Sequence, residues 1–161
     1  MGKLRGAVLR IGLRIPIVLY RWDVGWLLGR RFLLLVHTGR RTGNRYETVV
    51  EVLFCNPESG EIVVMSGWGR SADWFRNVEA AEATQIMIGC QRFMAAHRVL
   101  DEVEAAGVLA GYEDRNRWMI PIIRRVLSAL AGWTYDGSEQ SRRSLVRQLP
   151  LVAFRPLDPH R

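Results

Sequence analysis

The sequence predicts an α+β fold in which about six mainly antiparallel strands form a barrel-like sheet with helices inserted between them. Two patterns support this fold class. Short segments of strand length are separated by turns that contain glycine, proline and asparagine. A long stretch of helical pattern interrupts the strands, and one more strand follows it. The length of 161 residues and the hydrophobic content of 48% suit one globular core.

The N-terminal segment 1–30 is expected to form an amphipathic helical region ahead of a barrel domain that spans 31–161. Its apolar side chains recur at helical spacing, at Leu4, Val8, Ile11 and Ile15. Arg10 and Arg14 interrupt the apolar run and Pro16 ends it, so the segment lacks the roughly 20 apolar residues of a membrane span. It also lacks the apolar core and cleavage site of a secretory signal.

The first three strands are expected to follow one another as a meander. An unbroken apolar run at 32–36 predicts a strand that is buried on both faces. A turn at 39–44 leads into an alternating segment at 47–54, where one face carries Thr48, Val50, Val52 and Phe54. A second turn at 56–60 precedes a third strand at 61–65.

The second half of the chain adds three strands and three helices. We expect strands at 84–88, 92–100 and 151–154, and helices at 72–80, 101–131 and 138–148. Asp101 and Glu104 have the spacing of a capping box that starts the long helix. Pro121 is expected to break that helix, because proline lacks a backbone N–H and collides with the preceding turn.

The charge of the chain favours an anionic partner. The formal net charge is +7, from 23 lysines and arginines against 16 aspartates and glutamates, and Lys3 is the one lysine. Guanidinium groups recognise phosphate and carboxylate through planar, bidentate contacts. Nucleic acid, a membrane surface and a phosphorylated cofactor all fit this charge. Because the sequence carries no recognition-helix or RNA-platform motif, we expect no nucleic-acid partner.

Cysteine and histidine are too scattered for a metal site. Cys55 and Cys90 have no CxxC spacing, and neither has histidine partners at ligand spacing. His37, His97 and His160 lie far apart in the sequence and away from carboxylate clusters. We therefore expect no metal and no disulfide framework, and we interpret each histidine as a structural or surface residue.

Two loops are candidates for ligand binding. In the turn 39–43, Arg40, Arg41 and the Thr42 hydroxyl accompany glycines that let backbone N–H groups approach an anion. The alternative is a solvated hairpin tip. In the segment 66–77, glycines flank Trp68 and a second tryptophan follows at Trp74, so a planar heterocycle could pack there. The alternative is that Trp74 anchors the core and Trp68 covers the barrel.

Three motifs, in order, resemble the deazaflavin-dependent nitroreductase family of actinobacteria. They read LLVHTGRRTG at 34–43, VVMSGWG at 63–69 and DWFRN at 73–77, and the segment 149–156 is similar to the closing strand of that family. The resemblance implies a split β-barrel of the flavin-reductase-like class. It also implies that the cofactor is coenzyme F(420), an 8-hydroxy-5-deazaflavin.

The resemblance assigns roles to individual residues. Arg40, Arg41 and Thr42 match the turn that holds the phosphate and glutamyl tail, and Val64, Met65, Ser66 and Gly67 match the strand end whose backbone borders the ring. Trp74 and Asn77 match the tryptophan and asparagine at the start of the family's helix. We also expect cofactor contacts from Gly43, Thr48, Trp68 and Asp73.

The function implied is hydride transfer between the reduced deazaflavin and an electron-poor small-molecule acceptor, such as a nitro compound, a quinone or an activated enone. Such transfer requires no catalytic triad, and Tyr112 is a candidate proton donor. Two alternatives stay open: a split barrel that binds flavin mononucleotide (FMN), and a non-enzymatic basic module that binds a cofactor or a membrane surface. We expect a cytoplasmic protein, with residues 1–20 either at the inner membrane face or packed on the barrel. The sequence does not indicate the oligomeric state.

Overall fold

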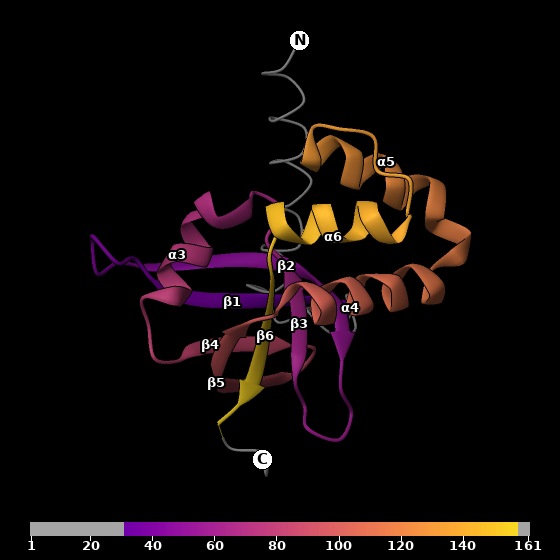
Figure 1. Cartoon of the computed structure of the whole chain (residues 1–161). Coiled ribbons are helices and arrows are strands. Elements are labelled where there is room, and N and C mark those ends of the chain that lie inside the picture. The colour runs from indigo at the N-terminus through magenta and orange to yellow at the C-terminus, as the bar shows by residue number, and fades with distance from the viewer. Residues whose placement is uncertain (1–30, 158–161) are drawn as a thin grey trace.

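A computed structural model describes residues 31–157 of the chain. Six antiparallel strands close into one barrel in the order β1-β2-β3-β6-β5-β4 (Figure 1). The strands are β1 (Phe32–Thr38), β2 (Arg45–Cys55), β3 (Ile62–Met65), β4 (Thr84–Ile88), β5 (Gln91–Val99) and β6 (Leu151–Pro156). The last strand of the chain therefore closes the barrel by pairing with β3 on one side and β5 on the other.

The helices form two groups around the barrel. The shorter group follows β3 and consists of the 3-10 helix η2 (Gly69–Ser71) and α3 (Asp73–Glu79). The longer group comprises α4 (Glu102–Arg115), the 3-10 helix η3 (Arg117–Met119), α5 (Ile120–Ala131) and α6 (Glu139–Gln148). Figure 1 shows α4, α5 and α6 gathered on one side of the barrel, while α3 lies apart from them.

Alternate residues of the strands fill the barrel interior. Leu33 and Leu35 of β1 belong to the same buried cluster as Val50 and Val52 of β2, because side chains two apart share one face of a strand. Helix α3 adds three large side chains to this cluster, Trp74, Phe75 and Val78. This short helix therefore covers one end of the barrel and is part of its core.

Strands β3 and β6 are buried on both faces, which explains their continuous apolar sequences. Their inward side chains are Ile62, Val64, Val152 and Phe154, and their outward side chains include Val63, Leu151 and Ala153. The outward set packs against residues of α4, α5 and α6 in a second buried cluster. The helical layer thus lies over β3 and β6.

A buried ion pair links the helices of this layer. The carboxylate of Glu113 on α4 is almost fully buried, and it accepts hydrogen bonds from Tyr135 Oη (3.0 Å) and Arg142 Nε (2.7 Å). Burial and the adjacent carboxylate raise the pKa of Tyr135. Because both carboxylate oxygens have a donor, the cost of burying this charge is offset.

The pairing of β2 with β3 contains an irregularity. Val52 pairs with Val64 and Phe54 pairs with Val63, so one extra residue of β2, Leu53, stands opposite the step between them. Bulges of this kind redirect neighbouring side chains and are frequent beside binding sites. Leu53 and Glu51, which is two residues before it, both line the apolar cavity described below.

The structure confirms the α+β barrel with about six antiparallel strands. It corrects one detail of the long helical segment. Helix α4 ends at Arg115, and Pro121 lies in the first turn of α5, where a missing N–H costs little. The amphipathic helix within residues 1–30 lies outside the described residues, so the division of the chain at residue 31 stays a prediction. No helix within 31–157 is long and apolar enough to cross a bilayer.

Candidate functional site

Two cavities of different chemical character meet at the end of the barrel that α3 covers. One has a volume of about 670 Å³, and most of its lining residues are polar residues of β1, the turn after it, β2 and α3. The other has a volume of about 400 Å³ and is lined mainly by apolar side chains from β2, α4 and α5. Four residues border both cavities: Glu47, Thr48, Trp68 and Trp74. The two cavities therefore form neighbouring parts of one candidate site.

The turn between β1 and β2 forms one wall of the polar cavity. Gly43 N–H donates to the Gly39 carbonyl at 2.8 Å, and Gly43 has a φ of 68°, a conformation that favours glycine. Any side chain at Gly39 would lie within 2.6 Å of Thr42 Oγ1 and 2.7 Å of the Tyr46 ring. The turn is therefore compact, and it brings Arg40, Arg41 and Thr42 to the cavity.

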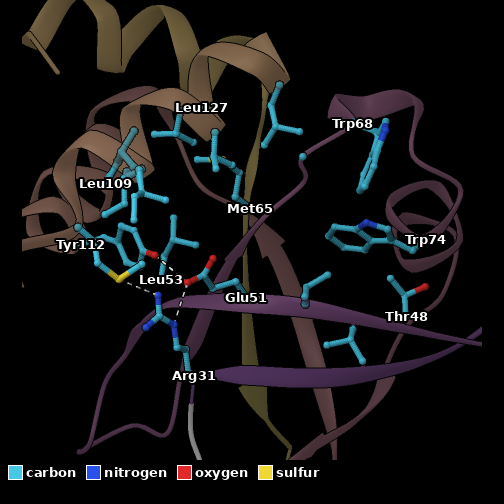
Figure 2. A pocket seen from close by; sticks show the side chains of 18 of the residues that line it. Arg31, Thr48, Glu51, Leu53, Met65, Trp68, Trp74, Leu109, Tyr112 and Leu127 are labelled. Atoms are coloured by element: carbon cyan, nitrogen blue, oxygen red, sulfur yellow. Dashed lines mark hydrogen bonds and ion pairs between the residues drawn. The ribbon is translucent and has the colours of Figure 1, made fainter. Parts of the chain in front are cut away.

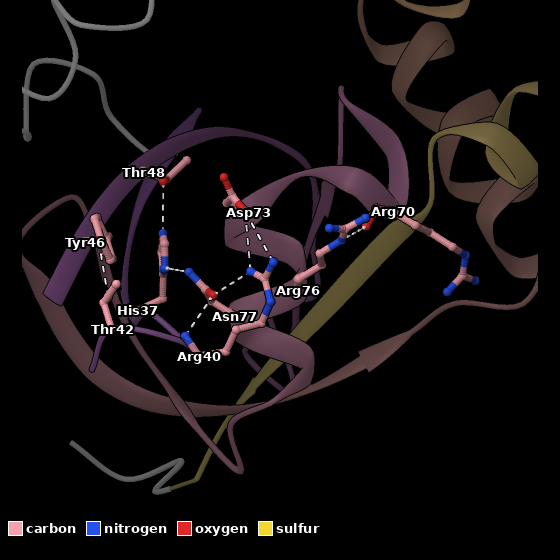
Figure 3. Close-up of polar contacts among 9 residues, drawn as sticks. All are labelled: His37, Arg40, Thr42, Tyr46, Thr48, Arg70, Asp73, Arg76 and Asn77. Atoms are coloured by element: carbon pink, nitrogen blue, oxygen red, sulfur yellow. Dashed lines mark hydrogen bonds and ion pairs between the residues drawn. The ribbon is translucent and has the colours of Figure 1, made fainter. Parts of the chain in front are cut away.

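Arg40 is held in place by α3 (Figure 3). Its backbone N–H and its Nη1 both donate to Asn77 Oδ1, at 3.1 and 3.0 Å. Nη1 also forms an ion pair with Asp73 Oδ1 at 3.4 Å, which is weak because the Asp73 side chain is exposed. Asn77 is thus the main link between the turn and the helix.

His37 lies beneath the same cavity, between Asn77 and Thr48 (Figure 3). Its Nδ1 is 3.1 Å from Asn77 Nδ2, and its Nε2 is 3.1 Å from Thr48 Oγ1. Burial lowers the pKa of His37, and the negative charge of Asp73 opposes this effect only in part. The ring is therefore held neutral and is hydrogen-bonded at both nitrogens.

Figure 2 shows the apolar cavity between β2 and the helices. Its helical wall consists of aliphatic side chains, namely Leu109 of α4 and Ile122, Ile123, Val126, Leu127 and Leu130 of α5. Met65 and Gly67, at the end of β3, complete the wall that leads to the two tryptophans. A cavity with these walls suits an apolar ligand, because the ligand removes mostly apolar surface from water.

A small polar cluster interrupts the apolar wall opposite the tryptophans (Figure 2). Tyr112 Oη donates to Glu51 Oε1 at 2.7 Å, and Arg31 Nε donates to the same oxygen at 3.2 Å. Burial, followed by the hydrogen bond to Glu51, raises the pKa of Tyr112. Tyr112 keeps its proton at neutral pH, as a proton donor must, but it already donates this hydrogen to Glu51, so its role as the direct proton donor stays a prediction.

The structure brings most of the predicted site residues together. The polar cavity is lined by Arg40, Arg41, Thr42, Thr48, Trp68, Asp73, Trp74 and Asn77, and the apolar cavity by Thr48, Met65, Gly67, Trp68, Trp74 and Tyr112. Three other predicted residues do not line either cavity. Gly43 shapes the turn, Val64 lies in the barrel core, and Ser66 is buried with its hydroxyl donating to the Gly69 carbonyl at 2.7 Å.

Several site residues were not predicted from the sequence. The sequence favours a structural or surface role for His37, although its place two residues after Leu35 indicates that it points inward. Glu51 and Arg31 were not recognised, because their proximity to Tyr112 depends on how α4 packs against β2. Within residues 31–157, no cluster of three or more histidine, cysteine or carboxylate side chains could hold a metal ion.

Solved structures with low sequence identity are similar to this chain, and those with a TM-score above 0.5 share its fold. HutZ, the heme storage protein from Vibrio cholerae, is 16% identical, covers 83% of this chain and 86% of its own, and has a TM-score of 0.52. The protein Atu2129 of unknown function from Agrobacterium tumefaciens is 12% identical, with coverage of 87% and 53% and a TM-score of 0.51. The F420-H2 dependent reductase FDR-A is also similar, with 16% identity, coverage of 78% and 95%, and a TM-score of 0.45.

Sequence similarity to a protein family says more about function than these similarities of fold. No curated protein matches the chain in sequence. Residues 18–119, however, match the model of the F420H(2)-dependent quinone reductases. This segment includes the turn, the two tryptophans and all of α3 and α4. The chain belongs to that family and is an oxidoreductase that depends on the deazaflavin coenzyme F(420).

Proposed function

We propose that the polar cavity holds the anionic tail of coenzyme F(420), that the four shared residues border its ring, and that the apolar cavity takes a quinone-type acceptor. One observation carries this proposal: the polar and apolar cavities meet at Thr48, Trp68 and Trp74. Hydride transfer needs donor and acceptor atoms within about 3–3.5 Å of each other. Two adjoining cavities of different polarity satisfy this need for an anionic cofactor and an apolar acceptor.

The chemistry of the polar cavity fits the cofactor tail. Arg40 and Arg41 supply guanidinium donors, and Thr42 supplies a hydroxyl. Charge-assisted hydrogen bonds of this kind suit phosphate and carboxylate groups. Arg40 is already directed by Asn77, so less conformational entropy is lost when it binds an anion.

The junction of the cavities fits a planar ring. Trp68 stands at the rim with 52% of its surface exposed, whereas Trp74 is buried beneath it. When bound, the reduced deazaflavin supplies a hydride to the acceptor. The protein provides flat apolar surfaces, a hydroxyl from Thr48 and an adjoining apolar cavity for the acceptor.

The apolar cavity fits a quinone-type acceptor with a polar group at one end. The aliphatic side chains of α5 surround the apolar part of such a molecule. Arg31 can donate to a carbonyl oxygen, and Tyr112 holds the neighbouring carboxylate of Glu51 in position. The cluster therefore orients the acceptor, while the aliphatic walls supply most of the binding energy.

Fluorescence titration tests the cofactor assignment. Coenzyme F(420) should bind the purified protein more tightly than FMN, and Arg41→Ala should weaken the binding of F(420) by about 1–3 kcal/mol, which is roughly 5- to 150-fold. Equal affinities for the two cofactors, or normal binding by the variant, would contradict the assignment of the polar cavity.

A pair of valine variants tests the acceptor assignment. Val126 lies at the mouth of the apolar cavity, so Val126→Trp should raise the KM for a short-chain quinone by about tenfold without changing the Kd for the coenzyme. Val103 is an exposed residue of α4 that does not line the cavity, and Val103→Trp is the matched control. The assignment fails if Val126→Trp leaves the KM unchanged or if both variants raise it equally.

A further inference from the structure

A chain of hydrogen bonds at the floor of the polar cavity joins four of its lining residues (Figure 3). It begins at Arg40, passes through Asn77 and His37, and ends at Thr48. All four line the cavity, but His37 and Asn77 are only 7% and 4% exposed, whereas Arg40 is exposed and Thr48 is partly exposed. The two buried residues are therefore placed to act on a ligand through their neighbours.

The direction of each hydrogen bond follows from the donors and acceptors present. Asn77 Oδ1 accepts from two donors of Arg40, so the amide nitrogen of Asn77 must face His37. That nitrogen can only donate, and His37 Nδ1 must therefore be the acceptor. A neutral ring that accepts at Nδ1 carries its proton at Nε2, and Nε2 then donates to Thr48 Oγ1.

The hydrogen bond from His37 to Thr48 determines where the Thr48 hydroxyl can donate its hydrogen. Because Thr48 Oγ1 accepts from His37, its rotatable hydroxyl hydrogen is directed away from the ring and can be donated to a group in the cavities. Thr48 borders both cavities, so the hydroxyl lies where the proposed cofactor ring and acceptor meet. The accepted bond excludes the position in which the hydroxyl hydrogen would point at His37, and it leaves the positions from which Thr48 can donate to a ligand.

The charges around His37 support the neutral form. Arg40 approaches from the turn, Tyr46 of β2 stacks on the ring at a centroid distance of 6.0 Å, and α3 contributes Asp73 and Asn77. Only Asp73 favours a proton on the ring, and burial outweighs it. Protonation would place an N–H at Nδ1 against the amide nitrogen of Asn77, and two donors would then face each other.

We propose that His37 is a positioning residue for the coenzyme site. Its Nε2–H tautomer fixes the hydroxyl of Thr48, and its Nδ1 fixes the amide of Asn77, which in turn directs Arg40 into the cavity. The inference rests on the proposed function, because it takes the polar cavity to be the place where the coenzyme binds. Its structural part can be tested without any ligand.

Nitrogen-15 NMR of the full chain without coenzyme tests the tautomer. The His37 ring should show a protonated Nε2 and an unprotonated Nδ1 at neutral pH, and it should take up a second proton only below its ordinary pKa of about 6.5. An Nδ1–H tautomer would overturn the proposal whatever binds in the cavity. The outcome is independent of whether the cavity assignment is right.

Coenzyme titration across pH tests the positioning role. In the parent, the Kd for coenzyme F(420) should rise as pH falls through the pKa of His37, by at most about tenfold per pH unit, because one proton is exchanged. His37→Gln keeps one acceptor and one donor but cannot titrate, so it should bind within about threefold of the parent at neutral pH and lack this additional acid dependence. Protonation of the coenzyme itself affects binding to both proteins equally, so it produces no difference between them.

Two further variants complete the test. Thr48→Val removes the hydroxyl and keeps the shape, so it should weaken coenzyme binding or slow hydride transfer by about five- to tenfold. His97→Gln makes the same change at a histidine of β5 that lines neither cavity, and it should behave like the parent. The proposal fails if Thr48→Val matches the parent in both measurements, or if His37→Gln keeps the acid dependence of the parent.

Discussion

Replacing Trp74 with alanine should destabilise the fold, whereas the same change at Trp68 should mainly affect ligand binding. Trp74 is 6% exposed and packs in the barrel core, with its ring edge-on to Phe75 at a centroid distance of 5.9 Å. Trp68 is 52% exposed and stands between two glycines at the rim of both cavities. The two side chains border the same cavities but are buried to very different extents.

The burial of each ring sets the expected magnitude. A buried tryptophan removes about 200 Å² from water, and at about 25 cal/mol per Å² this corresponds to roughly 5 kcal/mol as an upper value. Truncation of Trp74 should therefore cost about 3–5 kcal/mol of the free energy of unfolding, the usual range for a large buried aromatic. Trp68 has about half of that burial, and a loop at the rim can relax, so its truncation should cost less than about 2 kcal/mol.

Urea unfolding without cofactor measures these costs, and fluorescence titration with coenzyme F(420) measures binding. Trp118→Ala is a matched control, because Trp118 is 78% exposed on η3 and lines neither cavity. The control should change neither quantity. If Trp68→Ala is the more destabilising variant, or if it binds the coenzyme like the parent, the interpretation of the two tryptophans is wrong.

Other substitutions separate binding from stability. Arg41→Ala should weaken coenzyme binding by about 1–3 kcal/mol in a titration and leave urea unfolding unchanged, because its side chain is exposed at the turn. Arg40→Ala should also lower the free energy of unfolding by about 1 kcal/mol, since Asn77 Oδ1 loses one of its two donors; equal stability would contradict this. Tyr112→Phe should raise the KM for a quinone while single-turnover reduction stays within about tenfold, and a larger loss would make Tyr112 the proton donor. Gly69→Ala should destabilise the protein by more than about 1 kcal/mol in calorimetry, because φ is +64° and a Cβ would lie 2.8 Å from a backbone oxygen; an unchanged Tm would refute this.

The individual strands and helices could be predicted because local chemistry marks each of them. The turn after β2 is one example, since Asn56 Oδ1 accepts from the backbone N–H groups of residues 58 and 59 and so closes the turn. The start of α4 is another, since Asp101 accepts from the backbone N–H of Glu104 at 2.9 Å, as the capping-box spacing predicts. Both contacts form between residues a few positions apart, so they can be read from the sequence.

The order of the strands in the barrel could not be predicted in the same way. Strand β6 pairs with β3 through Ile62 and Phe154, and with β5 through His97 and the same phenylalanine. Pairings over such a separation depend on how the helices fold onto the sheet, and no local pattern specifies them. The alternation of strands and helices predicts a barrel-like domain, the family resemblance implies a split β-barrel, and the structure confirms that the six strands close into a barrel.

The two cavities of the candidate site also differ in how far the sequence predicts them. Most residues of the polar cavity come from the three short motifs, although Tyr46, Glu47 and Thr48 of β2 do not, so Arg40 and Asn77 could be assigned from the resemblance alone. The apolar cavity is formed where α4 and α5 pack over β2, and the polar cluster of Arg31, Glu51 and Tyr112 comes from three separate segments. Only tertiary packing brings these three side chains together.

The polar end of the barrel core explains why the site forms under α3 and not elsewhere on the sheet. The inward positions of β1 and β2 carry aliphatic side chains until the last step, where His37 and Thr48 replace them. Burying such groups is costly unless each is hydrogen-bonded, and Asn77 meets this need while its carbonyl oxygen holds Arg40. Apolar side chains in this layer would fill the same space without the cost of burying polar groups. Stability alone therefore does not account for the polar side chains. The proposed positioning role accounts for them, because the layer holds the two groups, the Arg40 guanidinium and the Thr48 hydroxyl, that line the cavity.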